Sequence, residues 1–192
     1  MSREAARALS TDDVLAPVVE EHGPLELEPA DDIFERLVVA IVRQQVSMDA
    51  AAAIRERLFE TVDVSPATLR GADTGPLTEA GLSAAKAEYV QNVARAFDER
   101  GYDRPYFADR PDAEVLTELT EIRGIGPWTG KMFLLFCLGR PDVFPVEDLG
   151  IRKGMELVTG DDLDRPAMCD RAEQWQPYRS YASLYLWRAY EA

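Results

Sequence analysis

The sequence predicts an all-α protein of roughly ten helices, and three observations lead to this prediction. Apolar residues recur at helical spacing along nearly the whole chain. No segment alternates convincingly enough between apolar and polar residues to form a strand. No internal repeat or long biased linker divides the chain, whose 192 residues are 46% apolar, enough for one domain or two small lobes.

Helix starts are marked by capping residues, because their side chains satisfy free amides at a helix N-terminus. The expected starts are Ser47 for a helix over 48–60, Ser65 with Pro66 behind it, Ser83 for 84–97, Asp112 for 113–122 and Asp148 for 149–158. Further helices are expected over 33–41, 132–139, 167–175 and 177–191. Residues 1–30 lie outside this bundle, and the sequence leaves open whether they pack onto the C-terminal helices.

The composition predicts a soluble protein that stays in the cytoplasm. No run approaches the roughly 20 apolar residues that span a membrane, and the N-terminus lacks the apolar core of a signal peptide. Cys137 and Cys169 lie far apart in sequence and indicate neither a disulfide framework nor a zinc or iron–sulfur site.

The net charge of −14 would ordinarily argue against nucleic acid as a partner. Only three lysines stand against 35 acidic residues, a balance expected of a halophile, so the charge can report habitat rather than partner. Residues 121–155 escape the acidic bias, with five basic and four acidic side chains.

Two motifs lie in that stretch. Gly124-Ile125-Gly126 joins two helical runs in a tight turn whose exposed amides, with the following helix N-terminus, suit an anion such as a DNA phosphate. A plain helix–helix turn is the alternative. Further on, Asp148 follows Pro145 in "FPVEDLGIRKG", where it is either a capping residue alone or a functional carboxylate.

The run "IRGIGPWTGKMFLLFCLGRPDVFPVEDLGIRKG" resembles the helix-hairpin-helix DNA glycosylases (HhH-GPD superfamily), most closely the 3-methyladenine DNA glycosylase II branch. Three other blocks extend the resemblance over about residues 31–190 in the family's order: "FERLVVAIVRQQVSMDAAAAIRERL", "GLSAAKAEYVQNVARAF" and "WQPYRSYASLYLWRAY". The resemblance implies a single glycosylase unit over 1–192, with a cleft between two lobes. One lobe is a bundle over 31–140 that contains the hairpin 122–128; the other joins 1–30 to 141–192.

Departures from the family pattern narrow the expectation. The family's strand-cleaving members carry a lysine where this chain has Trp128, so Schiff-base chemistry is not expected. The four-cysteine iron–sulfur loop is missing, and so is room for the N-terminal α+β domain of longer relatives. No cofactor is expected to be required.

The resemblance also implies a role for each matched residue. Asp148 is the catalytic carboxylate, Trp128 and Trp187 wall the base pocket, and Gln45 is the wedge that fills the gap left by a flipped nucleotide. The hairpin residues Gly124, Ile125, Gly126 and Thr129 meet the DNA phosphate. The carbonyls of Thr120, Ile122 and Ile125 would hold a monovalent cation such as sodium or potassium.

The expected partner is double-stranded DNA with damaged bases, bound by a monomer at the nucleoid of a cell without a nucleus. The expected substrate is 3-methyladenine, with 7-methylguanine, hypoxanthine and ethenoadenine as further candidates. Two alternatives stay open: a glycosylase of the same fold for an oxidised or deaminated base, and a non-enzymatic helix-hairpin-helix module that only binds DNA.

Overall fold

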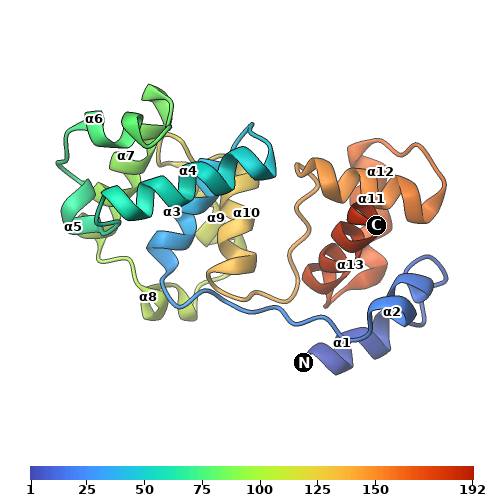
Figure 1. Ribbon diagram of the computed structural model, residues 1–192. Helices are drawn as coiled ribbons and strands as arrows, with labels where there is room; N and C mark the ends of the chain where they lie inside the picture. The colour runs from blue at the N-terminus through green and yellow to red at the C-terminus, as the bar shows by residue number, and fades with distance from the viewer. The chain divides into compact units, whose positions relative to one another are not determined.

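The computed structural model describes residues 1–192 and contains thirteen α-helices, one short 3-10 helix (η1) and no strand (Figure 1). This confirms the all-α prediction, and ten of the helices have seven residues or more. The helices fall into two compact units. The terminal unit comprises residues 1–29 and 139–192, and the middle unit comprises residues 30–138.

The middle unit is built around α3, whose apolar face is completely buried. Leu37, Val38 and Ile41 are 0% exposed, and α3 packs against α4, α7 and α10. Burying aliphatic side chains at helical spacing supplies the main stabilising free energy for such a bundle. The helices are α3 (Ile33–Arg43), α4 (Met48–Thr61), α5 (Pro66–Leu69), α6 (Thr74–Glu79), α7 (Ala84–Arg100), α8 (Arg104–Ala108), α9 (Asp112–Thr120) and α10 (Pro127–Phe136).

The terminal unit is organised by the close pairing of α11 and α13. Gly154 of α11 lies so near the backbone of α13 that a Cβ there would stand 2.0 Å from the carbonyl oxygen of Leu186. Only glycine permits this approach, so the spacing of the two helices depends on it. The elements are α1 (Ser2–Leu9), α2 (Ala16–His22), α11 (Leu149–Thr159), α12 (Arg165–Ala172), η1 (Glu173–Trp175) and α13 (Arg179–Glu191).

The N-terminal helices pack back onto α13, which settles the point that the sequence left open. The Tyr185 hydroxyl donates to the carbonyl of Gly23 at 2.8 Å, and Arg171 Nη2 donates to both carboxylate oxygens of Asp12 at 2.9 and 2.7 Å. Burial alone would raise the pKa of Asp12, but the Arg171 hydrogen bond, with smaller contributions, lowers it below the ordinary value. These contacts tie both ends of the chain into one unit.

Most of the predicted caps are present. Ser47, Ser65, Ser83 and Asp148 each accept a hydrogen bond from an amide in the first turn of the following helix. The prediction for Asp112 was wrong. Pro111 occupies the N-cap position and Asp112 is the first residue of α9, where its negative charge favours the positive end of the helix dipole.

Several boundaries also differ from the prediction. The helix expected over 132–139 begins at Pro127, the one expected over 177–191 begins at Arg179, and the one expected over 167–175 is α12 followed by η1. The short helices α6 and α8 were not predicted. No helix has the length and apolarity that a membrane crossing requires.

Candidate functional site

Asp148 lies at the N-terminus of α11 in the terminal unit, half-buried and held by two donors on one oxygen. Oδ1 accepts a hydrogen bond from the Ile151 amide at 3.1 Å and another from the indole nitrogen of Trp187 at 2.9 Å. The first bond is the cap that the sequence predicts. The second comes from α13, so the helix pair α11–α13 fixes the orientation of the carboxylate.

The turn that leads into Asp148 is held by the guanidinium of Arg152. Its Nη1 donates to the carbonyl oxygens of Glu147 at 2.9 Å and Val146 at 3.3 Å. The Asp148 amide in turn donates to the carbonyl of Pro145 at 2.9 Å. A guanidinium that holds two successive carbonyls restricts the backbone, so the carboxylate sits on a rigid support.

The upstream segment is bound to the start of α13. The Ser180 hydroxyl, 0% exposed, donates to the Arg140 carbonyl at 2.6 Å and accepts from the Val143 amide at 2.9 Å. Arg179 donates to both carboxylate oxygens of Asp142 at 2.8 and 3.0 Å. The segment that precedes Asp148 is therefore anchored to the helix that carries Trp187.

The hairpin lies in the middle unit, between α9 and α10. Gly124 has φ of +110°, and a Cβ there would stand 2.3 Å from Cγ of Tyr89, so both conformation and space require glycine. Gly126 differs from the expectation. Its φ of −96° is open to any residue, and nothing lies within 4 Å of a Cβ placed on it. Only Gly124 serves the turn itself.

Gly126 is the exposed N-cap of α10 and brings no capping side chain. The first turn of a helix leaves amides without intrahelical acceptors, and these attract an anion. Ile125 is 4% exposed, so it anchors the turn in the core, and its amide donates to the Ile122 carbonyl at 3.0 Å. Thr129 is also turned inward at 2% exposed. Trp128, the second residue of α10, is half-buried.

Gln45 lies in the turn between α3 and α4, which we call the wedge turn (residues 44–46). It is exposed and has φ of +54°. All other residues with a positive φ are glycines. Holding a non-glycine residue in this backbone conformation costs on the order of 1–3 kcal/mol, and the conformation persists only where the surroundings enforce it. The wedge turn is therefore strained and exposed, and it contains Gln45, to which the family resemblance gives the role of wedge.

The preceding residue, Gln44, was missed by the sequence prediction. Its Nε2 donates to the carbonyl of Gly124 and to the hydroxyl of Thr129, both at 2.9 Å. The only sequence signal is the doublet Gln44-Gln45 at a helix break, and its partners lie 80 and 85 residues away. In the same region Lys86 Nζ donates to the carbonyl of Val42 at 2.8 Å.

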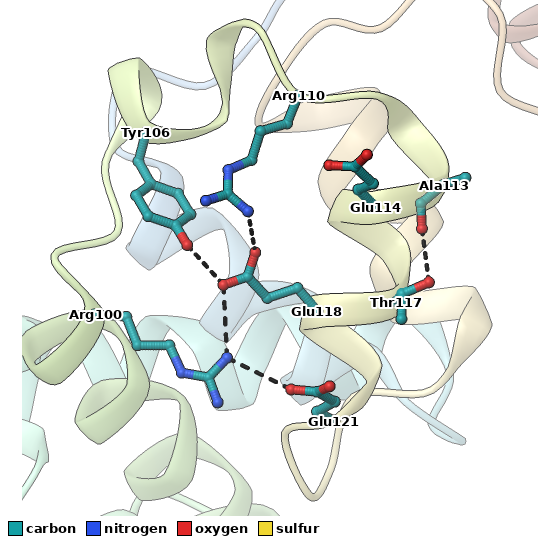
Figure 2. Close-up of a pocket in the computed structure, with 8 residues that line it drawn as sticks. All are labelled: Arg100, Tyr106, Arg110, Ala113, Glu114, Thr117, Glu118 and Glu121. Atoms are coloured by element: carbon teal, nitrogen blue, oxygen red, sulfur yellow. Dashed lines mark hydrogen bonds and ion pairs between the residues drawn. The ribbon is translucent and has the colours of Figure 1, made fainter.

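A pocket of about 560 Å³ on the middle unit contains none of the predicted site residues (Figure 2). Glu118 lies at its centre. One carboxylate oxygen accepts from the hydroxyls of Tyr106 at 2.7 Å and Tyr102 at 2.8 Å, and the other accepts from Arg110 Nη1 at 2.7 Å. Arg100 lies 3.6 Å from Glu118 and 3.7 Å from Glu121. The acidic and basic side chains of this pocket pair with one another. We therefore interpret it as a structural cluster that joins α7, α8 and α9, and we call it the hub.

Ionisation of this hub follows from its contacts. Burial alone would raise the pKa of Glu118, but the hydrogen bonds from Tyr106 and Tyr102 and the charges of Arg110 and Arg100 lower it below the usual value. Burial, together with the hydrogen bond to Glu118, raises the pKa of Tyr102 to about 12. The hub is held as a carboxylate with neutral phenols at neutral pH.

Comparison with known proteins identifies the class. Residues 38–177 match the family model of the HhH-GPD superfamily base excision DNA repair proteins. YfjP of Bacillus subtilis is 32% identical over 189 residues, and the match covers 92% of this chain and 66% of YfjP. DNA-3-methyladenine glycosylase 1 of Schizosaccharomyces pombe is 31% identical over 182 residues, covering 91% of this chain and 79% of the relative.

A solved structure agrees with these matches. The 3-methyladenine DNA glycosylase Mag1 of Schizosaccharomyces pombe, in complex with abasic DNA, superposes with a TM-score of 0.90 at 28% identity. The superposition covers 98% of this chain and 97% of that one. The chain belongs to the HhH-GPD superfamily of base excision DNA repair proteins. It spans about two thirds of the length of YfjP.

Proposed function

We propose that this protein is a monofunctional DNA glycosylase that hydrolyses the N-glycosidic bond of alkylated purines in double-stranded DNA. The observation that carries the proposal is the Asp148 carboxylate, held on the end of α11 by the Ile151 amide and the Trp187 indole. The family membership and the relatives named as 3-methyladenine glycosylases support the same activity.

Asp148 supplies the chemistry. As the base departs, positive charge develops on the sugar, and a fixed carboxylate either stabilises that charge or activates water to attack the sugar carbon. Glycoside hydrolysis ordinarily uses a second carboxylic acid to protonate the leaving group. An alkylated purine already carries positive charge and leaves without that help, so one carboxylate suffices.

The middle unit supplies DNA binding and nucleotide flipping. The hairpin and the first turn of α10 receive a phosphate, and Gln45 fills the space that the flipped nucleotide leaves in the stack. Trp128 offers an indole face, which attracts a cationic base by cation–π interaction, and Trp187 on α13 of the terminal unit offers a second such face. Because Trp128 stands where the family's strand-cleaving members carry lysine, the product keeps an unbroken backbone at the abasic site.

The hairpin offers backbone carbonyl oxygens that suit a monovalent cation. Thr120 ends α9, where carbonyls carry partial negative charge, and the Ile122 carbonyl accepts only the Ile125 amide, at 3.0 Å, so it retains a lone pair. With the Ile125 carbonyl, these oxygens would hold sodium or potassium, which would neutralise part of the phosphate charge.

A panel of duplexes tests the proposal. Each carries one lesion (3-methyladenine, 7-methylguanine, hypoxanthine, ethenoadenine, uracil or 8-oxoguanine), and base release is measured at several salt concentrations up to the molar range. We expect release of 3-methyladenine without strand cleavage by a monomeric protein. Release of only oxidised or deaminated bases would support a different lesion class, and binding without any release would support a DNA-binding module. Strand cleavage without heat or alkali would contradict the monofunctional assignment.

A further inference from the structure

The wedge turn and the phosphate-binding hairpin are joined through one side chain. Gln44 Nε2 donates hydrogen bonds of 2.9 Å to the Gly124 carbonyl, in the hairpin, and to the Thr129 hydroxyl, in the first turn of α10. Gln44 is also the C-cap of α3, so its backbone fixes the point where the chain leaves that helix.

The next residue has the strained backbone. Gln45 is exposed at φ of +54°, and such a conformation relaxes unless its neighbours are fixed. On the helix side, Lys86 holds the Val42 carbonyl at 2.8 Å. On the hairpin side, the Gln44 side chain holds the turn through its two hydrogen bonds, and one of its acceptors, Thr129, is buried in the core. The conformation of Gln45 therefore depends on contacts made by residues 42 and 44 rather than on its own side chain.

We propose that Gln44 is a positioning residue that locks the wedge turn to the hairpin, so that phosphate binding and wedge insertion occur as one rigid event. The inference rests on the proposed function, because it assigns Gln45 and the hairpin their roles on DNA. The carboxamide suits this task. It supplies two N–H donors to two oxygen acceptors, and both acceptors lie on the element that receives the phosphate.

The first test uses the protein alone. Gln44→Met keeps length and volume but removes both hydrogen bonds. We expect hydrogen–deuterium exchange over residues 43–47 and 123–127 to accelerate together by about ten-fold. The matched control is Gln91→Met, since Gln91 Nε2 makes a similar bond to the Ala72 carbonyl at 2.7 Å elsewhere in the middle unit. Unchanged exchange over the two segments in Gln44→Met would overturn the proposal, whatever the enzyme's activity.

The second test measures wedge insertion without catalysis. The probe is a duplex with a tetrahydrofuran abasic analogue opposite 2-aminopurine, whose fluorescence rises when the orphan base is unstacked. We expect Gln44→Met to weaken the insertion equilibrium about ten-fold. Thr129→Val should lose part of the signal, and Thr129→Ser, which keeps the hydroxyl, should retain more of it than Thr129→Val. Gln91→Met should match the wild type.

A double-mutant cycle separates positioning from general destabilisation. If Gln44 acts through Gln45, then Gln44→Met costs little further insertion in a Gln45→Ala background. Equal losses in both backgrounds would show that Gln44 does not act through the wedge residue. A wild-type protein that inserts into this duplex but releases no base from any duplex of the lesion panel would refute the proposed activity while leaving the role of Gln44 supported.

Discussion

The indole nitrogen of Trp187 donates to Oδ1 of Asp148 across 2.9 Å, and the same oxygen accepts the Ile151 amide at 3.1 Å. The two donors come from different helices, α13 and α11. The sequence assigns Trp187 only a face for stacking against a base. The structure adds an edge whose N–H orients the Asp148 carboxylate, while the stacking role of the indole face stays a prediction.

Trp187→Phe separates these two tasks, since phenylalanine keeps an aromatic face but has no N–H. We expect single-turnover base release to fall about ten-fold, the effect of losing a hydrogen bond to a charged group. Trp187→Leu should fall further because it also removes the cation–π surface. Equal rates for Trp187→Phe and the wild type would show that the hydrogen bond does not matter to the reaction.

Asp148→Asn tests the carboxylate itself. Asparagine caps a helix about as well as aspartate, so we expect the melting temperature and DNA affinity to change little. Base release should fall about a thousand-fold or more, because the negative charge that stabilises the developing positive charge is gone. Asp164→Asn is the matched control, since Asp164 caps α12 in the same unit through the Ala167 amide at 2.9 Å. Undiminished turnover in Asp148→Asn would refute the mechanism.

Local signals in the sequence were sufficient for most of the fold. Ser47, Ser83 and Asp148 precede apolar runs at helical spacing, and each forms the expected cap. Local sequence signals did not predict the elements whose formation depends on tertiary packing. Helices α6 and α8 have six and five residues, too few to show periodicity, and are secured by the burial of Leu77 and Phe107.

The site was predictable only in part, for the same reason. Asp148 is marked by its neighbours in sequence, and its placement on the end of α11 was expected. The bond from Trp187 spans 39 residues and the bonds from Gln44 span 80 and 85, so they follow from helix packing that no local pattern shows. The catalytic role of Asp148, the base pocket and the cleft between lobes stay predictions.

Gly154→Ala tests the pairing of α11 and α13 that supports Asp148 and Trp187. The added methyl would meet the Leu186 carbonyl oxygen at 2.0 Å, so the two helices must separate. We expect a loss of about 3 kcal/mol or more in the free energy of unfolding, measured by denaturant titration. Gly71→Ala is the control, because nothing lies within 4 Å of a Cβ there. Equal stability of the two variants would contradict the close helix contact.

Glu118 gives the middle unit a predictable response to acid. Its pKa is lowered in the folded protein from the ordinary 4.5, so its stabilising contribution is complete above about pH 4.5 and is lost as the pH falls through the folded pKa. We expect Glu118→Gln to lower the free energy of unfolding by about 1–2 kcal/mol at neutral pH. The difference from the wild type should shrink as the pH falls, because the wild-type carboxylate is then protonated as well. Glu114→Gln, an exposed change one turn earlier on α9, should show no such difference at any pH. A constant difference for Glu118→Gln from pH 7 to pH 2 would mean that the hub stabilises the unit through packing rather than through the charge of the carboxylate.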